Sequence, residues 1–338
     1  MQPSPGRPPL DPLTTGAIVL AVAAVSSSAP LIAFATAPAL AVAFWRNLIA
    51  TGVIAPWSLV RRRAEFRALT SGAGRRQGWY CVLSGVALAG HFATWMPSAQ
   101  LTSVAAATAL GATQPVWQGL IARWQGRRLP GTVWAGIGIA VLGAVLASGA
   151  DVAVSGRAFA GDLLAVTGAV FIAGYTALGE RARETVSTAA YTTICYSVCA
   201  AVLLVVCLVG GVRLGGYDTD TWLVILALVA GAQLLGHSMF NYALRRVSAT
   251  TVSVLILLEV PGAAVIGWLW LGQLPQPGSL PGLGVLLVGT VVVVLGGARA
   301  GRSQPVPLPG EVGPPPSGPA GPPTGPAGPP SGPAGPAT

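Results

Sequence analysis

Two stretches of this chain, Gly85-Val-Ala-Leu-Ala-Gly-His91 and Gly231-Ala-Gln-Leu-Leu-Gly-His237, match at an offset of 146 residues. The same register runs without gaps from 85–145 to 231–291, where proline meets proline and tryptophan meets tryptophan (Pro115 with Pro261, Trp124 with Trp270). The Gly-His pair is the most informative match, because the whole chain contains only two histidines. The sequence therefore predicts two halves built on one plan.

The composition indicates that both halves are embedded in a lipid bilayer rather than surrounded by water. Hydrophobic residues make up 53% of the chain and charged residues only 9%, with a mean hydropathy of +0.67. A soluble domain usually carries about a quarter of charged residues, so too few are present here to coat a water-exposed surface. Arginines supply all of the basic charge and fall in clusters between apolar runs, which is a membrane topology signal and excludes a basic nucleic-acid-binding face.

A helix that crosses a bilayer needs about 20 apolar residues. On this criterion we expect ten transmembrane helices, near 14–35, 38–60, 79–97, 101–123, 131–150, 160–180, 189–210, 221–243, 248–271 and 279–297. If the N-terminus is cytoplasmic, 16 of the 19 arginines fall in or beside cytoplasmic segments, as the positive-inside rule requires. The expected location is the cytoplasmic membrane, with both termini in the cytoplasm.

The expected fold class is an all-α integral membrane protein with ten transmembrane helices, arranged as two inverted five-helix repeats around a central cavity. The repeats cover 14–150 and 160–297, and we expect disorder at 1–13 and in the cytoplasmic Pro/Gly/Ala-rich tail at 301–338. Five is odd, so the second repeat must cross the membrane in the opposite sense to the first. Inverted repeats are typical of secondary transporters, which alternate access around a site near the midplane.

Several motifs in the second half carry a family resemblance. They are Asn241-Tyr-Ala-Leu-Arg-Arg-Val-Ser-Ala-Thr250, Pro261, Trp268-Leu-Trp-Leu-Gly-Gln273, the glycine-rich final helix and Gly161-Asp-Leu-Leu164. With these motifs the chain resembles the EamA-type permeases of the drug/metabolite transporter superfamily, over about residues 14–297. The resemblance implies a central cavity between the halves and the export or exchange of small solutes. The family often has a glutamate directly before the proline of the fourth and ninth helices, whereas here Gln114 and Val260 occupy those positions and Glu259 comes one residue earlier.

Candidate residues for the solute path or for proton coupling are polar groups at membrane depth, where they are costly unless they face a cavity or a partner. Glu259 could bind a proton or a cationic solute, or it could be a protonated structural carboxyl. Gln233, His237 and Asn241 share one helix face at a spacing of four residues. His91 is the repeat mate of His237, with Trp95 one turn further on, and either histidine could line the cavity or be a buried structural residue.

Three further candidates have two interpretations each. Gln114 could line the solute path or bridge helices, and Tyr175 could form an aromatic wall or pack in the core. Arg46, within the second expected helix, could bind an anion or pair structurally. Two histidines without nearby ligands do not make a metal site, the four cysteines form no C-x-x-C, and no P-loop or hydrolase motif occurs.

The sequence thus predicts a secondary active transporter, with no enzymatic activity and no cofactor. We expect it to export a small metabolite, amino acid or drug-like solute, with possible proton coupling. Its expected partners are that solute and the lipid bilayer, and not nucleic acid. The alternative is a membrane-embedded enzyme or lipid scramblase that uses the same cavity.

Overall fold

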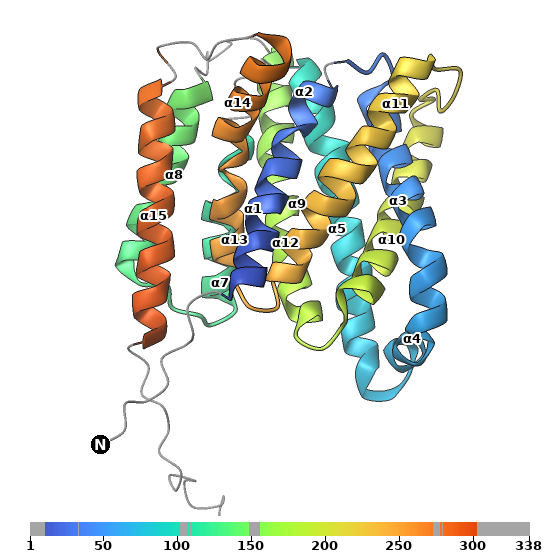
Figure 1. The fold of residues 1–338 in the computed structure, drawn as a ribbon, viewed down its shortest axis with the longest axis horizontal. Helices are drawn as coiled ribbons and strands as arrows, with labels where there is room; N and C mark the ends of the chain where they lie inside the picture. Colours follow the sequence, from blue (N-terminus) through green and yellow to red (C-terminus); the bar gives the residue numbers. More distant parts are fainter. Residues whose placement is uncertain are drawn as a thin grey trace, which may run out of the picture.

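The computed structural model describes residues 11–32, 34–101, 107, 110–148, 156–272, 278 and 280–302, and all regular secondary structure in these ranges is helical. The helices stand side by side in one bundle (Figure 1). In chain order they are α1 (Pro12–Ser26), α2 (Ser28–Ile32), α3 (Ala39–Arg61), α4 (Arg63–Thr70), η1 (Gly72–Gly74), α5 (Arg75–Leu101), α7 (Gln114–Trp124), α8 (Gly131–Ser148), α9 (Gly156–Arg183), α10 (Thr188–Val209), α11 (Thr219–Leu228), the π-helix η2 (Val229–His237), α12 (Ser238–Ala243), α13 (Ala249–Ile256), α14 (Glu259–Leu271) and α15 (Leu280–Arg302). The predicted disorder at 1–13 and 301–338 falls mostly outside the described residues.

Six helical stretches among the described residues are long and apolar enough to cross a membrane, which makes this a multi-pass membrane protein. They are Pro12–Ile32, Ala39–Arg61, Gly156–Arg183, Thr188–Val209, Thr219–Ala243 and Ala249–Trp270. Two shorter apolar helices, Gly131–Ala147 and Leu280–Gly296, match two more expected spans. The third expected span lies within α5, and part of the fourth falls outside the described residues. The all-helical membrane fold is confirmed, while the number of ten crossings stays a prediction.

Polar residues begin several of the long helices. Asp11, Ser187, Asp218 and Ser248 each precede a helix and accept, through the side chain, a backbone N–H of its first turn. Such N-caps satisfy groups that the helix cannot pair internally. The helix starts are therefore encoded locally, at the edges of the apolar runs.

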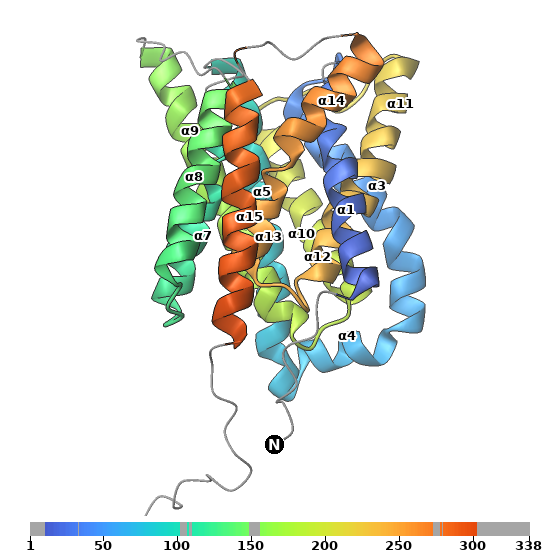
Figure 2. The same cartoon turned by 60° about the vertical axis from the view of Figure 1, so that its left-hand side comes forward.

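The contacts between α8 and α15 are related by the internal repeat. Gly143 of α8 lies against the backbone of Leu286, and Gly289 of α15 lies against the backbone of Ala140. Positions 143 and 289 are 146 residues apart, and so are 140 and 286, so each contact is the repeat equivalent of the other. The lower-numbered residue of α8 meets the higher-numbered residue of α15, which makes the two helices antiparallel. The same exchange relates two further pairs of contacts: Gly136 with Val293 and Gly282 with Ala147, and Gly90 with Phe171 and Gly236 with Val25. Equivalent helices of the two halves thus meet as an inverted pair, side by side in Figure 2.

The fourth and ninth expected helices are both interrupted inside the bundle, although the sequence predicted each as one helix. The chain turns at 112–113 before α7 begins at Gln114, and at 257–258 before α14 begins at Glu259. Pro115 and Pro261 cause these breaks, because proline has no N–H to donate and its ring clashes with the carbonyl four residues earlier. Prolines at matching positions of two repeats commonly mark the binding site of a transporter.

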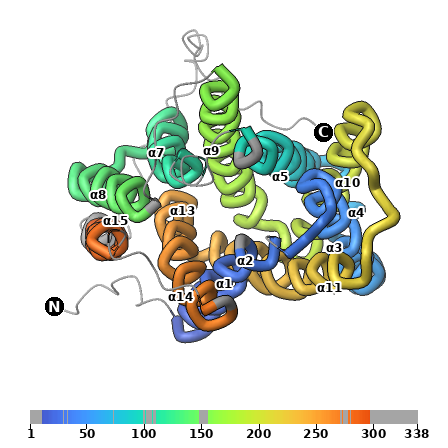
Figure 3. Tube along the Cα trace, turned by 90° about the horizontal axis from the view of Figure 1, so that it is seen from above, coloured from blue at the N-terminus to red at the C-terminus, as the bar shows by residue number. Residues whose placement is uncertain are grey.

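The connections that carry the arginine clusters gather at one end of the bundle. The start of α1, the end of α15, the α4 segment and the α7–α8, α9–α10 and α12–α13 connections all lie at the lower end in Figure 1. Seen from above, α7, α8, α13 and α15 lie on one side, α3, α10 and α11 on the other, and α1, α5 and α9 between them (Figure 3). We call the lower end the arginine-rich end.

Candidate functional site

A cavity of about 360 Å³ lies between the two halves, at the level of the two helix breaks. Its walls come from α1, α2, α3, α5 and α7 of the first half and from α9, η2, α12, α13 and α14 of the second. Eight of the nine residues singled out from the sequence line this cavity: Arg46, His91, Trp95, Gln114, Tyr175, His237, Asn241 and Glu259. The ninth, Gln233, does not line the cavity but accepts a hydrogen bond from Arg46, which does.

Arg46 is anchored by amide side chains rather than by a carboxylate. It is 3% exposed, and its Nε donates to Gln233 Oε1 over 2.8 Å. Gln233 in turn donates through Nε2 to Asn47 Oδ1 at 3.0 Å, so the two amides fix the arginine in place. The guanidinium carbon lies 5.0 Å from the ring centre of Phe92, and the buried Nη2 has no hydrogen-bond partner among the described residues. The charge of Arg46 is therefore held at the cavity through Nε, and Nη2 keeps donors that no described residue uses.

Tyr175 and Asn241 close one part of the cavity wall. The Tyr175 hydroxyl donates to Asn241 Oδ1 at 3.0 Å and accepts from Asn241 Nδ2 at 2.8 Å. The backbone carbonyl of Asn241 also accepts a hydrogen bond of 3.0 Å from Arg183 Nε. Both Tyr175 and Asn241 are buried, so this pair joins α9 to α12 inside the second half.

The two histidines are not equivalent in the folded protein. His91 Nδ1 lies 2.9 Å from the carbonyl oxygen of Gly168, and its ring stacks on Trp95 at 6.0 Å between centres. His237 instead makes edge contacts with the rings of Phe92 and Tyr175, and its nitrogens have no hydrogen-bond partner among the described residues. One histidine is thus held by the backbone, while the other presents free nitrogens to the cavity.

Glu259 and Gln114 are each the first residue of a half-helix that starts beside the cavity, although the exact repeat mate of Gln114 is Val260. Gln114 is buried and its Nε2 lies 3.5 Å from Thr176 Oγ1, a long hydrogen bond. Glu259 is half-buried and has no hydrogen-bond or ion-pair partner among the described residues. Glu259 therefore lines the cavity with a carboxyl group that no described residue pairs.

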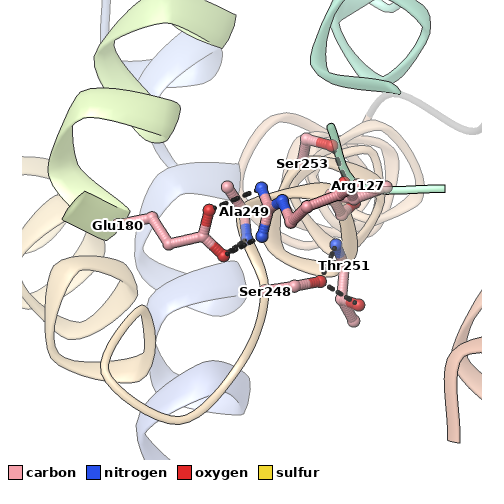
Figure 4. A network of polar contacts seen from close by, with 7 residues as sticks. Arg127, Glu180, Ser248, Ala249, Thr251 and Ser253 are labelled. Carbon is pink, nitrogen blue, oxygen red and sulfur yellow. Dashed lines mark hydrogen bonds and ion pairs between the residues drawn. The ribbon is translucent and has the colours of Figure 1, made fainter. Parts of the chain in front are cut away.

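A polar network ties the two halves together at the arginine-rich end, beyond the cavity (Figure 4). Arg127, after α7, forms a bidentate ion pair with Glu180 of α9, with N–O distances of 3.0 and 2.7 Å. Glu180 Oε1 also accepts the backbone N–H of Ala249, which opens α13. Arg127 and Glu180 were not among the residues selected from the sequence, because 53 residues separate them and no motif links them.

Both halves of the chain match one family of known proteins. The sequence model of the EamA-like transporter family matches residues 14–149 and again 159–295. One solved crystal structure superposes with a TM-score of 0.71 over 85% of this chain and 98% of the other, at 19% sequence identity, a likeness that speaks for the fold alone. No curated protein matches the chain. Because the family match spans most of the sequence in two copies, the chain belongs to the EamA-like transporter family.

Proposed function

We propose that this protein is a secondary active transporter that exports a small solute across the cytoplasmic membrane by alternating access. The cavity of about 360 Å³ between the halves supports this proposal most directly. Small-molecule sites are typically about 300–1,000 Å³, mostly apolar and lined by a few polar groups. The cavity has this character, and the family resemblance suggests the outward direction. A small metabolite, an amino acid or a drug-like solute would fit.

The proposal includes ten membrane crossings with both termini in the cytoplasm. The length of α5, 27 residues, is sufficient for a further crossing, and the inverted contacts of α8 and α15 require that equivalent helices run in opposite directions. The gathering of arginine-bearing connections at one end favours that end as the cytoplasmic one.

Alternating access requires the arginine-rich end to open and close. The contact between the halves that would have to separate there is the Arg127–Glu180 pair. The bidentate pair is partly exposed, with side-chain exposures of 39% for Arg127 and 14% for Glu180, so water reduces its strength. A partly exposed ion pair can stabilise the conformation in which the arginine-rich end is closed, at a free-energy cost that still allows this end to open.

Coupling to protons would involve Glu259, with His237 and His91 as further solute or proton contacts. Glu259 is the only carboxylate lining the cavity in the described part of the chain. If it carries a proton during transport, Glu259→Gln will transport at a rate independent of pH. Asp220→Asn is the matched control, because Asp220 is an exposed carboxylate at the start of α11 and does not line the cavity.

The experiment begins with a thermal-shift screen of the purified protein against amino acids, metabolites and cationic drugs. The best stabilising solute is then followed in proteoliposomes, with and without a pH gradient, for wild type, Glu259→Gln and Asp220→Asn. We expect the pH dependence to vanish in Glu259→Gln alone. An unchanged pH profile in this variant would refute the proton role. The absence of protein-dependent flux, together with protein-dependent movement of labelled lipid, would instead favour the scramblase alternative.

A further inference from the structure

A second pocket, of about 730 Å³, opens at the arginine-rich end, away from the cavity. Its lining comes from the end of α3, the end of α9, the first turn of α10 and the end of α12. We call it the basic pocket: it consists of Arg62, Arg183, Ser187, Thr188, Ala189, Tyr242, Arg245 and Arg246. Four of these eight residues are arginines and none is acidic, so positive charge is concentrated in a concave site.

Nearby carboxylates only partly neutralise this charge. Asp11 pairs with Arg246, with 3.2 Å between Oδ2 and Nε. Glu65 accepts the backbone N–H and the hydroxyl of Ser187, at the start of α10. No ion pair is found for Arg62 or Arg245 among the described residues, and both side chains are exposed. Four guanidinium groups thus face two carboxylates, which leaves an excess of positive charge.

The donors of the basic pocket divide into fixed and free groups. Arg183 is 2% exposed and uses its three nitrogens on Asn241, Val186 and Thr188, so it supplies charge rather than a free donor. Arg62 and Arg245 can turn into the pocket, and the first-turn N–H groups of Thr188 and Ala189 have no partner within α10. A helix N-terminus adds a partial positive charge to the same place.

We propose that the basic pocket binds a phosphate group, either as the headgroup of an anionic lipid or as a soluble phosphate. Guanidinium groups match phosphate oxygens in a bidentate geometry, and a phosphate offers enough acceptors to engage several arginines at once. Basic pockets between transmembrane helices on the cytoplasmic side are suited to lipid headgroups. Arg62 belongs to the first half and Arg245 to the second, so a bound phosphate would bridge the halves beside the solute path. This site is additional to the cavity and does not depend on the transported solute.

The test compares purified, delipidated wild type with the double variant Arg62→Gln/Arg245→Gln and with Arg128→Gln. Arg128 is an exposed arginine at the same end of the molecule that does not line the pocket, so its replacement controls for the loss of one positive charge outside the pocket. The replaced side chains make no hydrogen bond within the described residues, and all three proteins should melt alike without ligand. Thermal stability is then titrated with phosphatidylglycerol against phosphatidylcholine, and with inorganic phosphate against chloride at equal ionic strength.

We expect half-maximal stabilisation of wild type and Arg128→Gln at the same ligand concentration. Removing one charge-assisted hydrogen bond weakens binding by about tenfold, so the double variant should need about a hundredfold more ligand. A response to phosphatidylglycerol alone identifies a lipid as the ligand, and a response to inorganic phosphate identifies a soluble phosphate. Equal titration curves for the three proteins, or no response in wild type, would overturn the proposal.

Discussion

Glycine contacts between α8 and α15 give the most discriminating test of the inverted repeat. A methyl group added at Gly143 would overlap the backbone of Leu286, and one added at Gly289 would overlap the backbone of Ala140. By contrast, Gly138 and Gly284, also repeat mates, are exposed and have no atom within 4 Å of an added methyl. Alanine replaces glycine in a helix with a gain of about 1 kcal/mol, and this gain is common to all four positions. The difference between buried and exposed positions therefore isolates the packing cost.

Overpacking a close contact costs about 1–3 kcal/mol. We therefore expect Gly143→Ala and Gly289→Ala to unfold at lower temperature than Gly138→Ala and Gly284→Ala, by an amount corresponding to this cost. The two buried variants should be equally destabilised, because their contacts exchange under the repeat. The double variant Gly143→Ala/Gly289→Ala should be destabilised by less than the sum of the two single variants, since one outward shift of the helices relieves both overlaps. Thermal unfolding in detergent measures all five proteins, and equal stability of Gly143→Ala and Gly138→Ala would refute the close antiparallel packing.

Three further outcomes can be checked by thermal unfolding. In a double-mutant cycle, Arg127→Gln and Glu180→Gln should show a coupling of about 0.5–1 kcal/mol, since the pair is bidentate but partly exposed; additive effects would mean that it contributes nothing. Tyr175→Phe should cost about 1–3 kcal/mol by leaving the buried amide of Asn241 without its partner, and unchanged stability would show that the amide finds another. The backbone N–H of Thr221, followed by its hydroxyl, holds the pKa of Asp218 below its ordinary value of 3.8. The resulting stabilisation is present above that value and is lost as the pH falls through the lowered pKa, so Asp218→Asn should flatten this acid-side loss, and an unchanged profile would contradict the assignment.

Much of the site was accessible from the sequence because polar residues at membrane depth are rare. Glu259, Arg46 and the paired histidines stand out against an apolar background, and the repeat predicts that their helices meet. What the sequence could not supply was their partners. Arg46 bonds to Gln233, 187 positions away, and whether a carboxylate or an amide would meet it depends on the rotation of two helices about their axes.

The histidines show this limit most clearly. In the sequence they are equivalent, yet His91 bonds to the carbonyl of Gly168 while His237 has no such partner. The position equivalent to Gly168 in the first half is Val22, whose carbonyl accepts the hydroxyl of Ser26 instead. The two repeat mates thus differ in their hydrogen-bond partners, because their neighbouring helices differ in sequence.

Local physical chemistry allowed the sequence to determine several features of this protein. Apolar runs specify helices, N-caps specify their starts, and a repeat of 146 residues specifies that the halves share one plan. The breaks before Pro115 and Pro261 were not predicted, although proline explains them once they are seen. Tertiary structure alone decided which polar groups bond across helices, that Arg127 and Glu180 join the halves, and that four arginines from distant segments form one pocket. The reason is that hydropathy and capping act within a few residues, whereas pairing depends on helix rotation and depth, which only the packing of the whole bundle fixes.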